Sequence, residues 1–174
     1  MTIWSKVFTS KSFTKKPLII PFMIIYEPAT IYHRKEIESV LMQDEFISSE
    51  YFRKFMLDNN LNPMQEHGMV AFLNRKNYVV SCKALFAGGA TSCIVEPRAV
   101  FREALMHNAT AIVLCHNHPS GDPYPSSGDQ KITRQIREAG QIIDITLLDH
   151  IVLGERENDP NSLGYYSFRN AGLI

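Results

Sequence analysis

The sequence predicts an α/β (α+β) fold in which helices flank a mixed β-sheet. Residues 111–115 form a continuous apolar run, which is the pattern of a strand covered on both faces. Residues 68–86 contain two strand-like stretches separated by a polar turn at residues 74–77. Apolar residues recur at helical spacing on either side of the buried run, at residues 97–105 and 130–139. Strands that alternate with helices favour a layered fold around one sheet.

The chain has 174 residues, which suits one main domain. We place this domain at residues 50–174 and treat residues 1–49 as an N-terminal extension of uncertain structure. Within the extension, residues 23–32 resemble a strand interrupted by Pro28, and residues 34–43 show helical spacing.

The main domain is expected to open with a helix at residues 50–58. Ser48 or Ser49 would cap this helix, and the Asn- and Pro-rich residues 59–63 would end it. Pro97 occupies a favoured first-turn position of the next helix, whose apolar face comprises Val100, Phe101, Ala104 and Leu105. After the helix at residues 130–139, further strand is expected at residues 142–148, 150–153 and 165–168.

Charge and cysteine content limit the classes of function. Eighteen Lys and Arg residues balance eighteen Asp and Glu residues, so the net charge is zero. A dedicated nucleic-acid-binding protein usually shows a basic excess, which leaves nucleic acid as a secondary candidate partner. The three cysteines lie far apart in apolar stretches, as expected of reduced, buried thiols in a cytoplasmic protein.

An apolar run at residues 17–26 follows three lysines and resembles the start of a secretory signal. Pro17 and Pro21 interrupt the run, and no small-residue cleavage site follows before Glu27. The run is also shorter than the roughly 20 apolar residues of a membrane helix. We therefore predict a cytoplasmic protein with no membrane segment, with Met23 as an alternative start.

Residues 116–129 carry the strongest chemical signal, because ligand-type side chains cluster where the buried strand ends. His116 and His118 are two positions apart, so a strand places both imidazoles on one face. Pro119 ends ladder pairing, and a loop rich in proline and glycine leads to Asp129 at the start of the next helix. Two imidazoles and one carboxylate leave the fourth tetrahedral position for water, which is the pattern of a catalytic zinc site.

Each of these features also has a purely structural interpretation. Two histidines at a strand end can be satisfied polar side chains, and Ser126 with Asp129 resembles a helix capping box. The proline and glycine residues can mark only a surface loop. The combination of H-x-H-P at a strand end with S-x-x-D at a helix start favours a metal site over these separate explanations.

The segment resembles the JAMM motif of the JAB/MPN metalloprotease fold, in which H-x-H-P precedes S-x-x-D. More narrowly, residues 116–123, HNHPSGDP, are similar to the RadC-like branch, which is often labelled as DNA repair. The likeness extends to residues 97–105, 147–151 and 165–168, so it covers about residues 50–174.

This resemblance implies a cytidine-deaminase-like/MPN sheet flanked by helices and a zinc-dependent peptidase or isopeptidase. It implies that His116, His118 and Asp129 bind Zn²⁺. Ser126 would help to hold the tetrahedral intermediate by directing a hydroxyl donor at developing oxyanion charge. A protein or peptide is the implied substrate.

The family also uses an upstream glutamate, at the edge of an early strand, as general acid and base. Glu66 occupies the matching place. Glu96 and Glu103 are rivals, but Glu103 is expected to face solvent, and Glu96 stands where relatives typically carry histidine. Asp149 or His150 are candidates for partners that orient a metal ligand.

The longer RadC-like proteins carry a helix-hairpin-helix segment ahead of this domain. Residues 1–49 are too short for that segment, so we expect a short form that lacks it. Two alternatives to a hydrolase stay open, a DNA repair or recombination accessory protein and a non-catalytic interaction module. Lys131, Arg134 and Arg137 recur along one helix, although such spacing usually marks a solvated surface.

Overall fold

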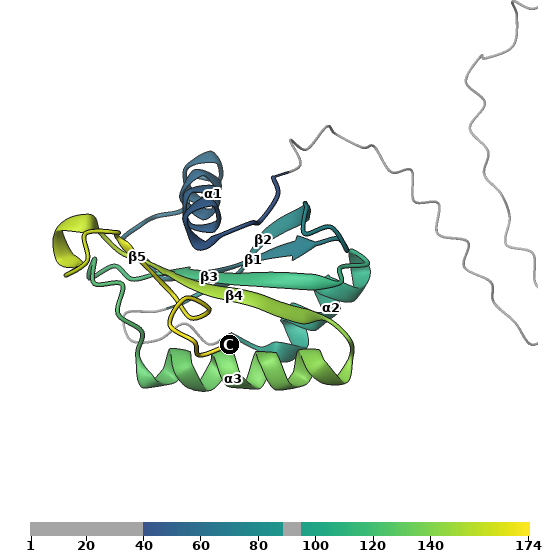
Figure 1. Ribbon diagram of the computed structural model, residues 1–174. Helices are drawn as coiled ribbons and strands as arrows, with labels where there is room; N and C mark the ends of the chain where they lie inside the picture. The colour runs from purple at the N-terminus through teal and green to yellow at the C-terminus, as the bar shows by residue number, and fades with distance from the viewer. Residues whose placement is uncertain (1–39, 89–94) are drawn as a thin grey trace, which may run out of the picture. The chain divides into compact units, whose positions relative to one another are not determined.

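The computed structural model describes residues 40–88 and 95–174. Within these residues, five strands form one mixed sheet in the order β2-β1-β3-β4-β5, accompanied by three α-helices (Figure 1). The predicted mixed sheet flanked by helices is therefore confirmed. The elements in chain order are α1 (Glu45–Asp58), β1 (His67–Leu73), β2 (Val79–Ala87), α2 (Pro97–Met106), β3 (Ala111–Asn117), α3 (Ser127–Ile142), β4 (Thr146–Leu153), the 3-10 helix η1 (Arg156–Asn158) and β5 (Tyr165–Ser167).

Helices cover both faces of the sheet, with α1 on one face and α2 and α3 on the other (Figure 1). Strand β3 lies at the centre, and all seven of its residues are buried. Its alternate side chains enter two different cores, because successive strand residues point to opposite faces. Val113 and Cys115 pack in the core under α1, whereas Ile112 and Leu114 pack in the core under α2 and α3.

The pairing of β4 with β3 is parallel, and α3 forms the connection between them. An irregularity interrupts the register, since Ile112 lies opposite Leu147 whereas Val113 lies opposite Asp149. Leu148 is thus an extra residue on β4, and a bulge of this kind reverses which face the following side chains occupy. His150 consequently faces α3, on the same side of the sheet as His116.

The prediction of a helix at residues 34–43 is wrong for residues 40–43, the part of this range that the structure describes. Residues 40–43 are not helical, and Leu41 instead forms an isolated bridge with Tyr78. Helix α1 begins earlier than predicted, because Asp44 is its N-cap and accepts a hydrogen bond from the Ile47 amide at 2.8 Å. Residues 1–39, with their predicted strand and apolar run, lie outside the described residues, and the division of the chain at residue 49 stays a prediction.

Three further expectations need correction. Ser48 and Ser49 are buried inside α1 and do not cap it. Helix α3 extends to Ile142, where a strand was expected, and ends before Asp144, whose φ of 57° is incompatible with a continuing helix. Leu105 was placed on the apolar face of α2, but its side chain is 60% exposed.

The predicted hairpin of β1 and β2 is confirmed. The predicted end of the first helix at residue 58 is also confirmed, because α1 ends at Asp58. The two cysteines that the structure describes, Cys82 and Cys115, are unpaired. Burial raises the pKa of the Cys82 thiol to about 12, as expected of an inert thiol. Among the described helices the longest, α3, has 16 residues, and none is long and apolar enough to cross a bilayer.

Truncation of Phe52 tests whether α1 is an integral part of this domain. Phe52 is 0% exposed in the core between α1 and the sheet, so Phe52→Ala should lower the free energy of unfolding by about 3–5 kcal/mol. Phe46→Ala is the matched control, because Phe46 lies on the same helix but is 55% exposed. Urea denaturation of both variants provides the measurement, and equal losses would mean that α1 does not support the core.

Candidate metal centre

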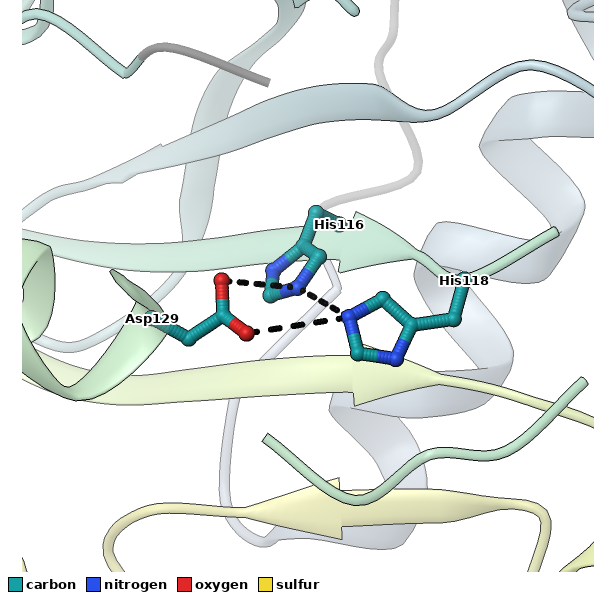
Figure 2. Close-up of side chains that lie close together, drawn as sticks. All are labelled: His116, His118 and Asp129. Carbon is teal, nitrogen blue, oxygen red and sulfur yellow. Dashed lines mark hydrogen bonds and ion pairs between the residues drawn. The ribbon is translucent and has the colours of Figure 1, made fainter. Parts of the chain in front are cut away.

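The end of β3 and the first turn of α3 bring His116, His118 and Asp129 together (Figure 2). His116 belongs to β3 and is 3% exposed, whereas His118 follows the strand and stays bonded to β4 through its amide and the Leu153 carbonyl at 2.8 Å. Asp129 is the third residue of α3. Among the residues that the structure describes, these form the one group of ligand-type side chains close enough to hold a metal ion.

The ligand-type atoms of the three side chains lie close together, and one such atom from each residue falls within 4.8 Å of the others. His116 Nε2 lies 3.0 Å from His118 Nε2 and 3.3 Å from Asp129 Oδ1, and His118 Nε2 lies 3.7 Å from Asp129 Oδ2. Zinc–ligand bonds of 2.0–2.1 Å in tetrahedral geometry place neighbouring ligand atoms roughly 3.3 Å apart. The two histidines contact different oxygens of Asp129, and the donor set is compatible with one zinc ion held by both ring nitrogens and one of these oxygens.

Hydrogen bonds determine which ring nitrogen of each histidine is free to bind a metal. His118 Nδ1 lies 2.7 Å from the Asp122 carbonyl, which can only accept, so Nδ1 carries the proton. The His116 ring is set by a longer chain, in which its Nδ1 lies 2.9 Å from His150 Nε2 and His150 Nδ1 lies 2.7 Å from Thr133 Oγ1.

The single hydroxyl proton of Thr133 determines the direction of this chain. It is donated to the Asp129 carbonyl at 2.5 Å, so Thr133 accepts from His150 Nδ1. Burial lowers the pKa of His150 well below its ordinary value, so the ring is neutral and its Nε2 accepts from His116 Nδ1. His116 and His118 thus both direct an Nε2 lone pair at the centre, and two lone pairs 3.0 Å apart repel unless a cation lies between them.

The electrostatics of the centre favour bound positive charge. Burial opposes ionisation of Asp129, but the neighbouring His116 and His118 rings, which donate to the carboxylate when they are protonated on Nε2, and the Ser126 hydroxyl hold its pKa well below the ordinary value. Burial likewise opposes protonation of His118, but hydrogen bonds to Asp129 and Asp122, together with the charges of Asp129 and Glu66, raise its pKa. A carboxylate is therefore present at the centre at all physiological pH values.

Ser126 orients the Asp129 carboxylate. It is the N-cap of α3 and forms a complete capping box with Asp129. Its hydroxyl donates to Asp129 Oδ2 at 2.6 Å, and its backbone amide donates to the same oxygen at 2.7 Å. The structural and the chemical interpretations of S-x-x-D thus coincide, because the bonds that cap the helix also aim the carboxylate. The predicted contact of Ser126 with an oxyanion stays a prediction.

The loop after His118 lies tightly against the end of β4. The Gly121 carbonyl accepts from the Glu155 amide at 2.7 Å, and a Cβ on Gly154 would lie 2.3 Å from that carbonyl oxygen. A side chain at Gly154 would therefore push the loop away. Gly121 has a φ of 80°, which favours glycine, and a Cβ there would clash with Asn158.

Asn117 connects β3 to the segment that carries Glu66. The Asn117 side chain accepts from the His67 amide at 2.8 Å and donates to the carbonyls of Pro63 and Gln65 at 3.1 and 3.0 Å. These three bonds hold residues 63–67 against β3, and Glu66 itself is partly buried. Glu66 lies near enough for its charge to act on His118.

Each of the two rival glutamates, Glu103 and Glu96, lies beside a basic side chain. Glu103 was expected to face solvent, but it is buried and forms an ion pair with Lys83 at 2.6 Å. The reason is that Lys83, on β2, neutralises the carboxylate. Glu96 is exposed at the start of α2, with Arg98 as its charged neighbour at 3.9 Å.

The sequence did not identify Asn117 and Thr133 as site residues, whereas His150 was foreseen as one of two candidate orienting partners. A signal for Thr133 was present, because it lies four residues after Asp129 on the same helix face. Asp149, the other candidate, instead accepts from Ser167 Oγ at 2.6 Å.

A family model supports the same assignment of the fold. The model described as the RadC-like JAB domain matches residues 44–173. The chain belongs to this family. Its match begins at the N-cap of α1 and includes every helix and strand that the structure describes.

Related proteins carry the name UPF0758, which states no activity. The protein of Clostridium novyi is 52% identical over 90 residues, covering 52% of this chain and 40% of the relative. Those of Clostridium botulinum and Bacillus licheniformis are 46% and 38% identical over 110 and 125 residues, covering 63% and 71% of this chain and 45% and 56% of the relatives. The RadC-like chain therefore spans about half the length of the curated relatives it matches.

Metal analysis tests the centre directly. The purified protein should bind about one zinc ion per chain, and His116→Ala or Asp129→Ala should remove most of it, because each variant loses one of three ligands. His107→Ala is the control, since His107 stacks on Phe72 rather than at the centre. Elemental analysis after dialysis gives the stoichiometry, and unchanged zinc in both ligand variants would refute the assignment.

Thr133→Val tests the hydrogen-bonded chain behind His116. Valine keeps the shape of threonine but cannot accept from His150, so the His116 tautomer is no longer fixed. Zinc affinity should fall roughly 10- to 100-fold. Thr146→Val is the matched control, because Thr146 is exposed on β4. Competition with a zinc-chelating dye measures both variants, and equal affinities would show that the chain does not orient His116.

Proposed function

We propose that the chain is a zinc-dependent hydrolase that cleaves an amide bond in a protein or peptide, either a peptide or an isopeptide bond. The spacing of the His116, His118 and Asp129 donors carries this proposal. Three protein ligands are typical of catalytic zinc sites, whereas structural sites usually have four. A zinc ion held there would supply a Lewis acid and lower the pKa of water towards about 7.

Glu66 would serve as the general base and then as the general acid. Its carboxylate would take a proton from the attacking water and deliver it to the leaving amine, which must be protonated to depart. The hydrogen bonds of Asn117 support this role, because they hold the Glu66 segment next to the strand that carries His116. Asn117 would therefore act as a positioning residue.

Ser126 would stabilise the reaction through Asp129 and, when substrate binds, through its hydroxyl. The hydroxyl donates to Asp129 Oδ2, so it lies beside the centre and can turn towards an oxyanion. His116 and His118 would keep their Nδ1 protons throughout, since these are committed to His150 and to the Asp122 carbonyl.

An accessory role in DNA repair is equally consistent with membership of the RadC-like family. It differs from the hydrolase proposal in the partner and not in the metal ligands. Arg134 and Lys131 are exposed on α3, the helix that also carries Asp129. A zinc hydrolase that acts on repair proteins in the cytoplasm would combine the two proposals.

Replacement of Glu66 by glutamine tests the chemistry separately from metal binding. Glu66→Gln should retain zinc but lose hydrolysis by about 10²- to 10⁴-fold, because an amide cannot relay the proton. Glu96→Gln should retain both properties, since the exposed Glu96 carboxylate lies beside Arg98.

The substrate for this comparison can come from a library of peptides and isopeptide-linked peptides, with cleavage read by mass spectrometry. Products that depend on zinc and disappear in Glu66→Gln identify the bond that is cut. Full turnover by Glu66→Gln on such a substrate would place the base elsewhere.

A further inference from the structure

A cavity of about 260 Å³ opens beside the metal centre. Helix α1 and the residues after it form one side, and the end of β4 forms another. His118 is part of its wall, so the cavity and the metal centre share one residue. The apolar lining consists of Met56, Leu57, Leu61, Pro63 and Leu153.

The polar groups around this cavity are mostly engaged elsewhere. Arg53 donates through Nη2 to the Gly154 and Gly164 carbonyls at 2.9 and 2.6 Å. The Asn117 amide makes its three bonds to residues 63–67. Leu57, in contrast, is a wall residue whose side chain is 77% exposed. The cavity thus offers mainly apolar contact, and the carboxylate of Glu155 is a charged group in its wall.

We propose that this cavity, here called the side-chain pocket, binds an apolar side chain of the amide substrate next to the bond that is cut. The inference rests on the proposed function and adds the substrate class. Consecutive Cα atoms are 3.8 Å apart, so a residue whose carbonyl lies at the metal centre places its own or its neighbour's side chain against His118. Because His118 borders both the metal centre and the pocket, the side chain that enters the pocket is one next to the bond that is cut.

The volume supports a single large side chain as the occupant. An apolar cavity of about 150 Å³ is sufficient to bind benzene, so the side-chain pocket accommodates a leucine or phenylalanine side chain. An acidic side chain would find Glu155 in the wall, while the guanidinium of Arg53 is bonded to two carbonyls. Leucine- or phenylalanine-like groups should therefore be preferred over aspartate-like groups.

Hydroxamates with different tails test the pocket in the zinc-loaded protein. 3-Phenylpropanohydroxamate should bind about tenfold or more tightly than acetohydroxamate, because it buries an apolar tail. The monohydroxamate of succinate should show no such gain. Calorimetry measures binding without any need for turnover, and equal affinities of the three compounds would overturn the pocket.

Two exposed leucines provide a matched pair of variants. Leu57 and Leu105 each lie one residue before the end of a helix and are 77% and 60% exposed, so aspartate should be tolerated at both. Leu57→Asp should abolish most of the gain from the phenyl tail and leave acetohydroxamate binding unchanged. Leu105→Asp should alter neither. The proposal would be overturned if Leu57→Asp bound 3-phenylpropanohydroxamate more tightly than acetohydroxamate by the same factor as the unaltered protein.

A metal-free experiment separates failure of the pocket from failure of the centre. In chelator-treated protein, N-acetylphenylalanine amide should shift the methyl resonance of Met56, whereas N-acetylglycine amide should not. An unmoved Met56 methyl would overturn the pocket whatever the metal result. A shift without any hydroxamate binding would support the pocket and refute the proposed zinc chemistry. Residues 1–39 are an alternative occupant of the side-chain pocket. The same titration of a variant without these residues tests this alternative, and an unchanged shift of the Met56 methyl resonance would show that they do not compete with the amide for the pocket.

Discussion

Strand β3 is the constraint on which the rest of the site depends. It is buried on both faces, and its alternating side chains must therefore fill two cores. At its end this alternation continues with polar residues, so His116 faces α3 while Asn117 faces α1. One strand end consequently supplies His116, a proposed metal ligand, on one side and a clamp for the Glu66 segment on the other. A shift of one residue in the register of β3 would exchange these positions and remove both.

The carboxylate of Asp129 reaches the histidines because the long connection between them is fixed at both ends. At its start, the Gly121 region lies against Gly154 at backbone contact distance. At its end, the capping box of α3 aims Asp129. The partly buried carboxylate stays ionised because the two neighbouring imidazole rings and the Ser126 hydroxyl offset its desolvation. Stability of the helix and readiness to bind a cation thus come from the same contacts.

The bulge at Leu148 determines which residue of β4 lies behind His116. Without the extra residue, the alternation that sends Leu147 towards α3 would send Asp149 there as well. The bulge instead puts His150 behind His116 and sends Asp149 to Ser167. A neutral imidazole therefore supports His116, where a carboxylate would add a second negative charge beside Asp129.

Much of this protein follows from the sequence alone. The buried run of β3, the hairpin before it and the H-x-H-P and S-x-x-D segments predicted the mixed sheet and the cluster of His116, His118 and Asp129, because strand and helix periodicities act locally. The sequence could not predict the bulge, the roles of Asn117 and Thr133, the buried ion pair of Glu103 or the cavity next to His118. Each of these depends on contacts between segments far apart in the chain, such as Asn117 with residues 63–67. Only the tertiary structure decides which of several polar side chains on neighbouring elements meet.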